Sequence, residues 1–307
     1  MKIIYFGSSE FSRLVLESVV NRGLSVSLAV SREDKPAGRG LKVKSTEVSR
    51  FCRNRNIPVL KPSDLSDVFD RISGEESDFF VVADYGKIIP GAILALPKKF
   101  PLGVHPSLLP SYRGSSPIER ALLNGDKFSG VTIFKMNERV DAGDIASQKK
   151  VAISAGDDFF SLRDRLAREG ADLLCSSLKD IEGGKIVFVP QNENKASYAF
   201  KFKKSDAKIN WKNKAEDINN LIRATIKWPG AYTFYKSKRI KVIKASIGGA
   251  KGENHPSVIV KLDKNGIGVA TSDKLLQIEL VKPEGKKEMD AWSFACGRNI
   301  EAGDSFD

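Results

Sequence analysis

The sequence predicts an α/β fold, with a doubly wound, mostly parallel sheet followed by a small C-terminal β-barrel domain. Three observations lead to this prediction. Apolar runs typical of buried strands alternate with helical periodicities through the first part of the chain. A polar stretch rich in chain breakers then interrupts the pattern at residues 190–195. Short strands with tight turns follow it.

The first domain opens with a strand, a turn and a helix. Residues 2–6 are apolar, a turn begins at Gly7, and apolar residues recur at helical spacing from Phe11 to Val19. A second apolar run follows, which predicts a right-handed βαβ unit. Gly7 is not part of a GxGxxG fingerprint, so the sequence gives no direct support for a dinucleotide. Further strands are expected at residues 26–30, 57–60, 79–83 and 102–104, with helices near 48–55 and from Asp157 or Asp158 to Gly183.

The last third of the chain changes character. An Asn265-Gly266 pair between two alternating runs predicts a hairpin. A small β-barrel of this kind often holds nucleic acid. We therefore expect a catalytic domain over residues 1–189, a linker over 190–204 and a C-terminal domain over 205–307. The strands of the C-terminal domain are expected at residues 231–234, 240–245, 258–262, 267–270 and 275–281.

Composition narrows the class of protein. With 307 residues, of which 41% are hydrophobic, the chain can bury two conventional cores. Its three cysteines are far apart and form no CxxC pair, which argues against a disulfide framework and a zinc site. No apolar stretch reaches membrane-spanning length, and the N-terminus is unlike a signal peptide. We expect a cytoplasmic monomer with no metal and no membrane association.

Positive charge gathers in the C-terminal third. The formal net charge is +12, and residues 201–307 contain 21 lysines and arginines against 13 acidic residues. A basic domain attracts polyanions, so nucleic acid or an acidic membrane surface is a candidate partner. Lysine-rich solvated faces without a partner remain an alternative.

Three segments contain residues suited to catalysis or anion binding. His105 is one of only two histidines and follows an apolar run, where an imidazole could act as an acid, a base or an oxyanion partner. A histidine that satisfies a buried backbone group is the alternative. The turn from Asp141 to Asp144 contains a glycine that would let a carboxylate approach His105. The basic segment 31–44 would contact phosphates or remain a solvated loop.

These segments resemble the motifs of one enzyme family. Residues 31–44 resemble the DxPAGRG insertion of methionyl-tRNA formyltransferases, His105 to Gly114 resembles their VHxSLLPxxRG signature, and Asp141 to Ile145 resembles their DxGDI turn. Folate-dependent formyltransferases of purine precursors and nucleotide sugars share the central signature, whereas the PAGRG loop is similar only to the tRNA enzyme. Segments that look like the family's C-terminal domain are 198–199, 209–211, 222–224 and 228–231.

The resemblance implies formyl transfer from 10-formyltetrahydrofolate to the α-amino group of methionine on initiator methionyl-tRNA. By this resemblance His105 would stabilise the oxyanion and move protons, and Asp141 would orient the imidazole. Ser107 lacks a GxSxG elbow, so its hydroxyl is better explained as capping the loop than as a nucleophile. The residues implied to line the pterin pocket are Tyr85, Gly86, Ile88, Pro90, Ser107, Leu108, Leu109, Pro110, Asp141 and Gly143. The residues implied to contact tRNA are Arg39, Lys42, Lys44, Lys201, Lys203 and Lys204.

One departure from the family pattern concerns the oxyanion. Gly103 stands where the family has an Asn whose amide donates to the formyl oxygen. Losing such a donor typically costs about 10²- to 10³-fold in rate. A water in the space left by the missing side chain, or another nearby amide, would compensate in part, and restoring Gly103→Asn is expected to raise turnover. Two other functions stay open: a catalytically impaired RNA-binding homologue, and a folate-dependent formyltransferase of an amino sugar nucleotide.

Overall fold

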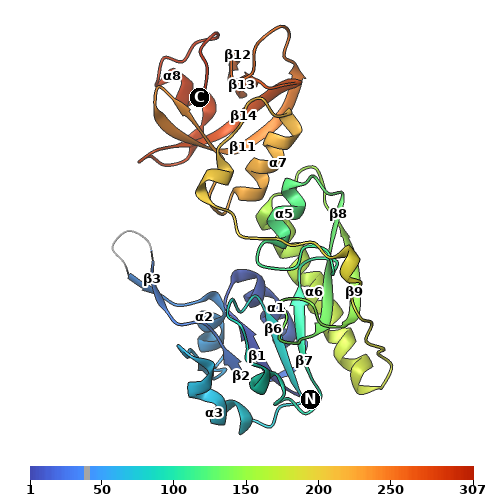
Figure 1. The fold of residues 1–307 in the computed structure, drawn as a ribbon. Helices are drawn as coiled ribbons and strands as arrows, with labels where there is room; N and C mark the ends of the chain where they lie inside the picture. The colour runs from blue at the N-terminus through green and yellow to red at the C-terminus, as the bar shows by residue number, and fades with distance from the viewer. Residues whose placement is uncertain (38–41) are drawn as a thin grey trace. The chain divides into compact units, whose positions relative to one another are not determined.

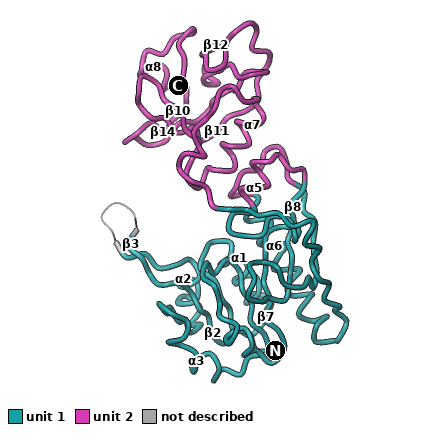
Figure 2. The backbone as a smooth tube through the Cα atoms, viewed as in Figure 1, with its two compact units in different colours: residues 1–117, 128–152, 162–200 teal, residues 118–127, 153–161, 201–307 magenta. Residues whose placement is uncertain are grey.

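The computed structural model describes residues 1–37 and 42–307, and it divides into two compact units (Figure 1 and Figure 2). Unit 1 comprises residues 1–117, 128–152 and 162–200, whereas unit 2 comprises residues 118–127, 153–161 and 201–307. The expected division differs from these units in two respects. Two short segments from the first half of the chain belong to unit 2, and residues 190–200 of the expected linker belong to unit 1.

Unit 1 contains a seven-stranded sheet in the order β5-β2-β1-β6-β7-β8-β9. The five strands from β5 to β7 are parallel, and β8 and β9 add an antiparallel edge. This arrangement confirms the predicted mostly parallel α/β fold. Its strands are β1 (Lys2–Gly7), β2 (Ser25–Val30), β5 (Val59–Leu60), β6 (Phe79–Ala83), β7 (Phe100–His105), β8 (Phe128–Lys135) and β9 (Ile145–Ala152).

Local sequence explains the helix starts and the first turn of unit 1. Ser9 caps the first helix by accepting from the amide of Ser12. Gly7 is the last residue of β1. A Cβ at this position would lie 1.8 Å from Ser12 Oγ, so the first helix can approach the strand this closely only because the residue is a glycine. The α-helices of this part of the chain are α1 (Glu10–Asn21), α2 (Glu47–Asn54), α3 (Phe69–Ser73), α4 (Gly91–Leu94) and α6 (Phe159–Glu182), and the short 3-10 helices are η1 (Leu65–Val68) and η2 (Glu193–Lys195).

The two faces of the sheet are covered by different helices. On one face, Gly170 of α6 packs closely against Val104 and Val131. On the other, side chains of α3 and α4 join strand residues in one core cluster that includes Phe6 and Val82. Since Val82 is the register partner of Gly103, the alternate residues Gly103 and His105 of β7 belong to this second face.

Parts of unit 1 differ from the sequence-based expectation. The strand expected at 57–60 is confined to Val59–Leu60, where it pairs with β2. The basic segment 31–44 is not a loop throughout, because β3 (Lys35–Ala37) and β4 (Lys42–Lys44) pair as an antiparallel hairpin. Asp158 caps α6 by accepting from the amide of Ser161, which matches the predicted start of that helix. No helix within the described parts of the chain is long and apolar enough to cross a membrane.

Unit 2 is built on an antiparallel sheet in the order β10-β11-β14-β13-β12, with β15 paired to β14. The C-terminal β domain is present as predicted, and the predicted hairpin joins β12 to β13, with Lys264 and Asn265 in the turn and Gly266 as the first residue of β13. The side chains of Trp211, Ile218 and Phe294 join its core. Its elements are α5 (Pro117–Leu123), η3 (Lys204–Ala207), α7 (Ala215–Thr225), β10 (Tyr232–Tyr235), β11 (Lys238–Ala250), β12 (Ile259–Asp263), β13 (Gly266–Ala270), β14 (Lys274–Pro283), β15 (Met289–Asp290) and α8 (Ala291–Cys296).

Candidate active site

His105 and Asp141 meet at the carboxyl end of β7. The imidazole is nearly buried, with 8% of its side chain exposed, and its Nδ1 lies 3.6 Å from Asp141 Oδ2. The other ring nitrogen, Nε2, lies 2.9 Å from the carbonyl oxygen of Tyr112. A carbonyl oxygen can only accept, so Nε2 donates this hydrogen bond. Asp141 Oδ2 faces the other ring nitrogen, Nδ1, at a distance longer than a hydrogen bond.

The carboxylate of Asp141 is itself held in place. Its Oδ2 accepts from the amide of Gly114 at 2.8 Å, which links the turn to the end of the signature segment. The backbone of Asp141 is in the left-handed region at φ +49°, a conformation that non-glycine residues adopt only where their surroundings impose it. A Cβ on Gly143 would lie 1.7 Å from the carbonyl oxygen of Lys135, so only glycine fits at that position of the turn.

The space beside Gly103 is filled by an aromatic ring. Gly103 and Phe134 are register partners on β7 and β8. A Cβ on Gly103 would lie 2.3 Å from Phe134 Cε1 and 2.5 Å from Cζ, and the ring is buried. The expectation that a water occupies the space of the missing side chain is therefore wrong. The ring also borders Gly143, whose added Cβ would lie 3.4 Å from Phe134 Cδ2.

The loop after β6 presents the predicted pterin-pocket residues in different ways. Tyr85 is buried and packs its ring edge-to-face on Phe6 at 5.8 Å. Burial raises the pKa of Tyr85 to about 12, so its hydroxyl stays protonated near neutral pH. Ile88 is 78% exposed although it is apolar, whereas Ile89 beside it is buried in the core. Gly86 and Pro90 are exposed as well.

The segment after His105 is held by buried hydroxyl groups. Ser107 Oγ donates to the carbonyl of Ser111 at 2.6 Å, which is the loop-capping role expected for it. Thr132 Oγ1 donates to the carbonyl of Ser107 and accepts from the amide of Leu109. Leu109 is buried, while Leu108 and Pro110 are partly exposed. These bonds fix the loop that follows the imidazole.

Sequence reasoning missed two residues that support this loop. Arg113 is only 1% exposed, and its guanidinium donates to both carboxylate oxygens of Glu193, at 2.9 and 3.1 Å. This hydrogen-bonded pairing lowers the pKa of Glu193 to about 2. The two residues are 80 positions apart, and Glu193 belongs to a stretch that its polar composition made resemble a linker. An arginine in a signature segment that contains no other lysine or arginine is a local signal that such a partner exists.

The residues predicted to contact tRNA are exposed where the structure describes them. Lys201, Lys203 and Lys204 are exposed at the start of the main part of unit 2. Lys44 is also exposed, with its Nζ 3.6 Å from Glu47. Arg39 and the side chain of Lys42 lie outside the described parts of the chain. Their contact with tRNA stays a prediction.

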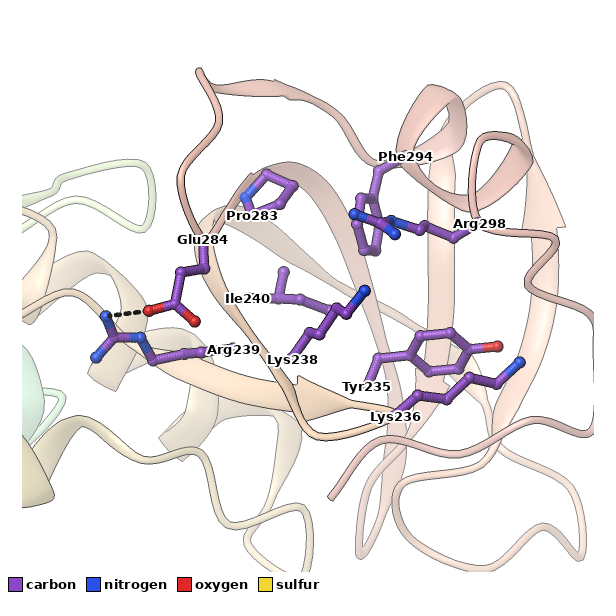
Figure 3. A pocket seen from close by; sticks show the side chains of 9 residues that line it. All are labelled: Tyr235, Lys236, Lys238, Arg239, Ile240, Pro283, Glu284, Phe294 and Arg298. Atoms are coloured by element: carbon purple, nitrogen blue, oxygen red, sulfur yellow. Dashed lines mark ion pairs between the residues drawn. The ribbon is translucent and has the colours of Figure 1, made fainter.

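Unit 2 also contains a basic cavity that sequence reasoning did not single out. It has a volume of about 430 Å³ and lies between the end of β10, the start of β11 and the region of α8 (Figure 3). One carboxylate, Glu284, lies 3.6 Å from the guanidinium of Arg239. The other lining residues include three more cations and two aromatic rings: Lys236, Lys238, Arg298, Tyr235 and Phe294.

Comparison with known proteins places the whole chain in one family. A family described as formyl transferase matches residues 1–178, and one described as formyl transferase, C-terminal domain, matches residues 201–299. A methionyl-tRNA formyltransferase of Thermodesulfovibrio yellowstonii is 39% identical over 99% of this chain and 98% of its own. Another, of Carboxydothermus hydrogenoformans, is 41% identical over 100% of both chains. The chain belongs to the methionyl-tRNA formyltransferase family.

Solved structures share the fold of this formyltransferase. HypX from Aquifex aeolicus, in complex with tetrahydrofolic acid, has a TM-score of 0.68 at 15% identity and covers 96% of this chain and 47% of its own. An N-formyltransferase from Helicobacter canadensis, in complex with folinic acid and dTDP-3-aminofucose, has a TM-score of 0.67 at 20% identity over 94% and 100%. At these identities the likeness concerns the fold alone. The family predicted from the sequence motifs is thus confirmed by the curated relatives.

Proposed function

We propose that this protein transfers the formyl group of 10-formyltetrahydrofolate to the α-amino group of methionine on initiator methionyl-tRNA. The observation that carries this proposal is the His105–Asp141 pair, with 3.6 Å between Nδ1 and Oδ2, in a chain that belongs to this family over its whole length. The amide of Gly114 holds the same carboxylate oxygen. The pair lies at the carboxyl edge of the parallel strands, where α/β sheets bind their ligands.

In this proposal the side chains of the pair manage charge and protons. The bound cosubstrate supplies the formyl group. The amine of methionine forms a bond to the formyl carbon, the bond from that carbon to N10 of the folate breaks, and one proton passes from the amine to N10. Nε2 of His105 would exchange the Tyr112 carbonyl for the substrate, stabilise the negative charge that develops on the formyl oxygen and move the proton, and Asp141 would hold the imidazole in orientation. The arrangement needs no covalent enzyme intermediate.

Two exposed segments fit the two substrates. The folate would contact the loop 85–90, where the exposed side chain of Ile88 offers an apolar surface to a flat ring. The loop 107–110 and the turn at Asp141 and Gly143 would form the rest of the pocket. The tRNA would contact the exposed lysines at the start of the main part of unit 2 through its phosphates. The basic segment 31–44 would reach the same substrate.

A formylation assay tests the proposal. The protein is incubated with 10-formyltetrahydrofolate and methionyl initiator tRNA, and formylmethionine on the tRNA is measured. Methionyl elongator tRNA and a dTDP-linked amino sugar serve as competing acceptors. We expect formylation of the initiator tRNA, and product only on the amino sugar would refute the proposal.

Two matched variants test the role of His105. His105→Ala should abolish turnover and leave tRNA affinity unchanged, because the imidazole acts on the reacting atoms. His255→Ala is the control, because it removes the only other histidine of the chain, which is exposed in a turn. Equal activity of the two variants would show that His105 is not the catalytic group. Binding of tRNA with no formylation by the unmodified protein would identify a catalytically silent RNA-binding homologue.

A further inference from the structure

Gln191 joins the turn that contains Asp141 to a buried arginine. Its side-chain amide Nε2 donates to the carbonyl oxygens of Asp141, at 2.9 Å, and of Gly143, at 2.7 Å. Its Oε1 accepts from Arg113 Nε and Nη2, at 3.0 and 2.8 Å. Both hydrogens of Nε2 and both lone pairs of Oε1 are thus matched by a partner. A side chain bonded on both ends has little freedom to move.

Arg113 is a rigid anchor for this amide. A guanidinium that is 1% exposed must be paired, and Glu193 pairs it through two parallel hydrogen bonds. Glu193 also accepts from Arg139 Nη2 at 2.9 Å, so the carboxylate is fixed from a second direction. The planar guanidinium donates two further hydrogens, from Nε and Nη2, to Gln191 in a fixed geometry. The position of Gln191 therefore follows from an ion pair whose guanidinium is buried and whose carboxylate is half exposed.

The turn needs an external support of this kind. Asp141 has φ +49°, which an aspartate keeps only where neighbouring groups fix its backbone. Gln191 binds the carbonyls on both sides of Ala142, so it spans the part of the turn that sets the direction of the Asp141 side chain. Without it, two carbonyl groups would lose their partner at the edge of the site.

We infer that Gln191 is a positioning residue for formyl transfer, which acts through the turn to hold the Asp141 carboxylate against His105. The role in formyl transfer rests on the proposed function. The support of the turn rests on the hydrogen bonds of Gln191 alone. The clamp, defined as Glu193, Arg113 and Gln191, makes the segment after α6 part of the catalytic unit rather than a passive connection to unit 2. Its effect is on the geometry of the turnover step and not on the binding of tRNA.

Gln191→Met tests this role, because methionine has a similar length but cannot donate to the two carbonyls. We expect kcat to fall by about 10- to 100-fold, since small displacements of catalytic groups have effects of this size. The KM for tRNA should stay within about twofold, because Gln191 holds none of the residues proposed to contact tRNA. Asn194→Ala is the matched control, since it truncates an exposed amide three residues along the same segment.

A second measurement separates positioning from general loss of stability. The amide of Gly114 donates to Asp141 Oδ2, so its hydrogen exchange reports whether the carboxylate stays in place. In Gln191→Met its exchange should become at least about tenfold faster, while the amides of β1 keep the rates of the control. If Gln191→Met does not fold, Gln191→Asn, which shortens the same amide by one methylene, replaces it in both measurements.

The two proposals fail in different ways. If the unmodified protein and Asn194→Ala do not formylate methionyl-tRNA, the proposed function fails, and exchange at Gly114 still tests the clamp. If both formylate and Gln191→Met keeps the same kcat and the same Gly114 exchange, the clamp is refuted. Equally faster exchange across all of unit 1, or a change confined to KM, would also refute it, because either result would mean that Gln191 does not act through Asp141.

Discussion

Replacing Gly103 with asparagine tests whether the ring of Phe134 decides what this site can contain. Carbon atoms in contact normally lie about 3.5–4.0 Å apart, whereas an added Cβ would lie 2.3 Å from Phe134 Cε1. To accept the Cβ, the ring of Phe134 must move by about 1 Å or more. Such a movement is costly because the ring is buried and borders Gly143. Overpacking of this kind typically costs about 1–3 kcal/mol. Gly103→Asn alone should therefore lower stability by about that amount and, contrary to the expectation from the sequence, should not raise kcat.

A second substitution, at Phe134, should make room for the asparagine side chain. Phe134→Val removes the three ring atoms nearest the added Cβ and places a residue favoured in strands on β8. The double variant should recover about 1–3 kcal/mol relative to the sum of the single variants, as contacting residues do. If its amide then reaches the formyl oxygen, kcat should exceed that of Phe134→Val by up to about 10²-fold.

Urea unfolding and single-turnover formylation measure the two effects. Both are followed in the unmodified protein, the two single variants and the double variant. Gly103→Asn alone with unchanged stability and a raised kcat would refute the reasoning, because it would show that the ring yields freely. Strictly additive changes in the free energy of unfolding would refute it as well, since they would mean that the two side chains do not compete for one space.

Three further predictions follow from charge and exposure. The ionised carboxylate of Glu193 stabilises the folded protein at pH values above 4.5, its ordinary pKa, and this stabilisation should be lost as the pH falls toward about 2. In urea unfolding, Glu193→Gln should lack this part of the pH dependence. Cys296 is exposed, whereas burial raises the pKa of Cys52 to about 12, so mass spectrometry after brief alkylation should find label on Cys296 first. Replacing Lys201, Lys203 and Lys204 with glutamine should reduce the salt slope of tRNA binding by up to about three, and an unchanged slope would exclude phosphate contacts there.

The elements that the sequence predicted well are those whose burial is visible in single runs. All five residues of β6 are buried, and the run 79–83 is apolar throughout. The Asn265-Gly266 turn and the capping Asp158 are local signals of the same kind. The strand β9 was not predicted, because most of its residues are polar or exposed and its other edge carries a single bridge, between Ile145 and Val189. Its position depends on a neighbour rather than on its own composition.

The supports of the site could not be predicted, because they depend on contacts between distant segments. Phe134 meets Gly103 only through the antiparallel register of β7 and β8. Gln191 and Glu193 reach Arg113 across 78 and 80 positions from a stretch that has the composition of a linker. The polar composition of this stretch indicates only that it can lie in water. The side chains of Gln191 and Glu193 are instead held by the buried guanidinium of Arg113. The functional roles of His105 and Asp141 stay predictions.

The chain passes between the two units five times, and this has a consequence for how the protein is made and altered. A ribosome releases residues 118–127 well before residues 201–307, which complete the same unit, so the early segment must wait for its packing partners during synthesis. The guanidinium of Arg120 lies 4.3 Å from the ring centre of Phe202, one of the contacts that such a delay leaves unmade. A shortened protein ending at residue 200 would leave the contacts of residues 118–127 with the rest of unit 2 unmade, so any exchange of unit 2 between relatives has to transplant the two inner segments as well.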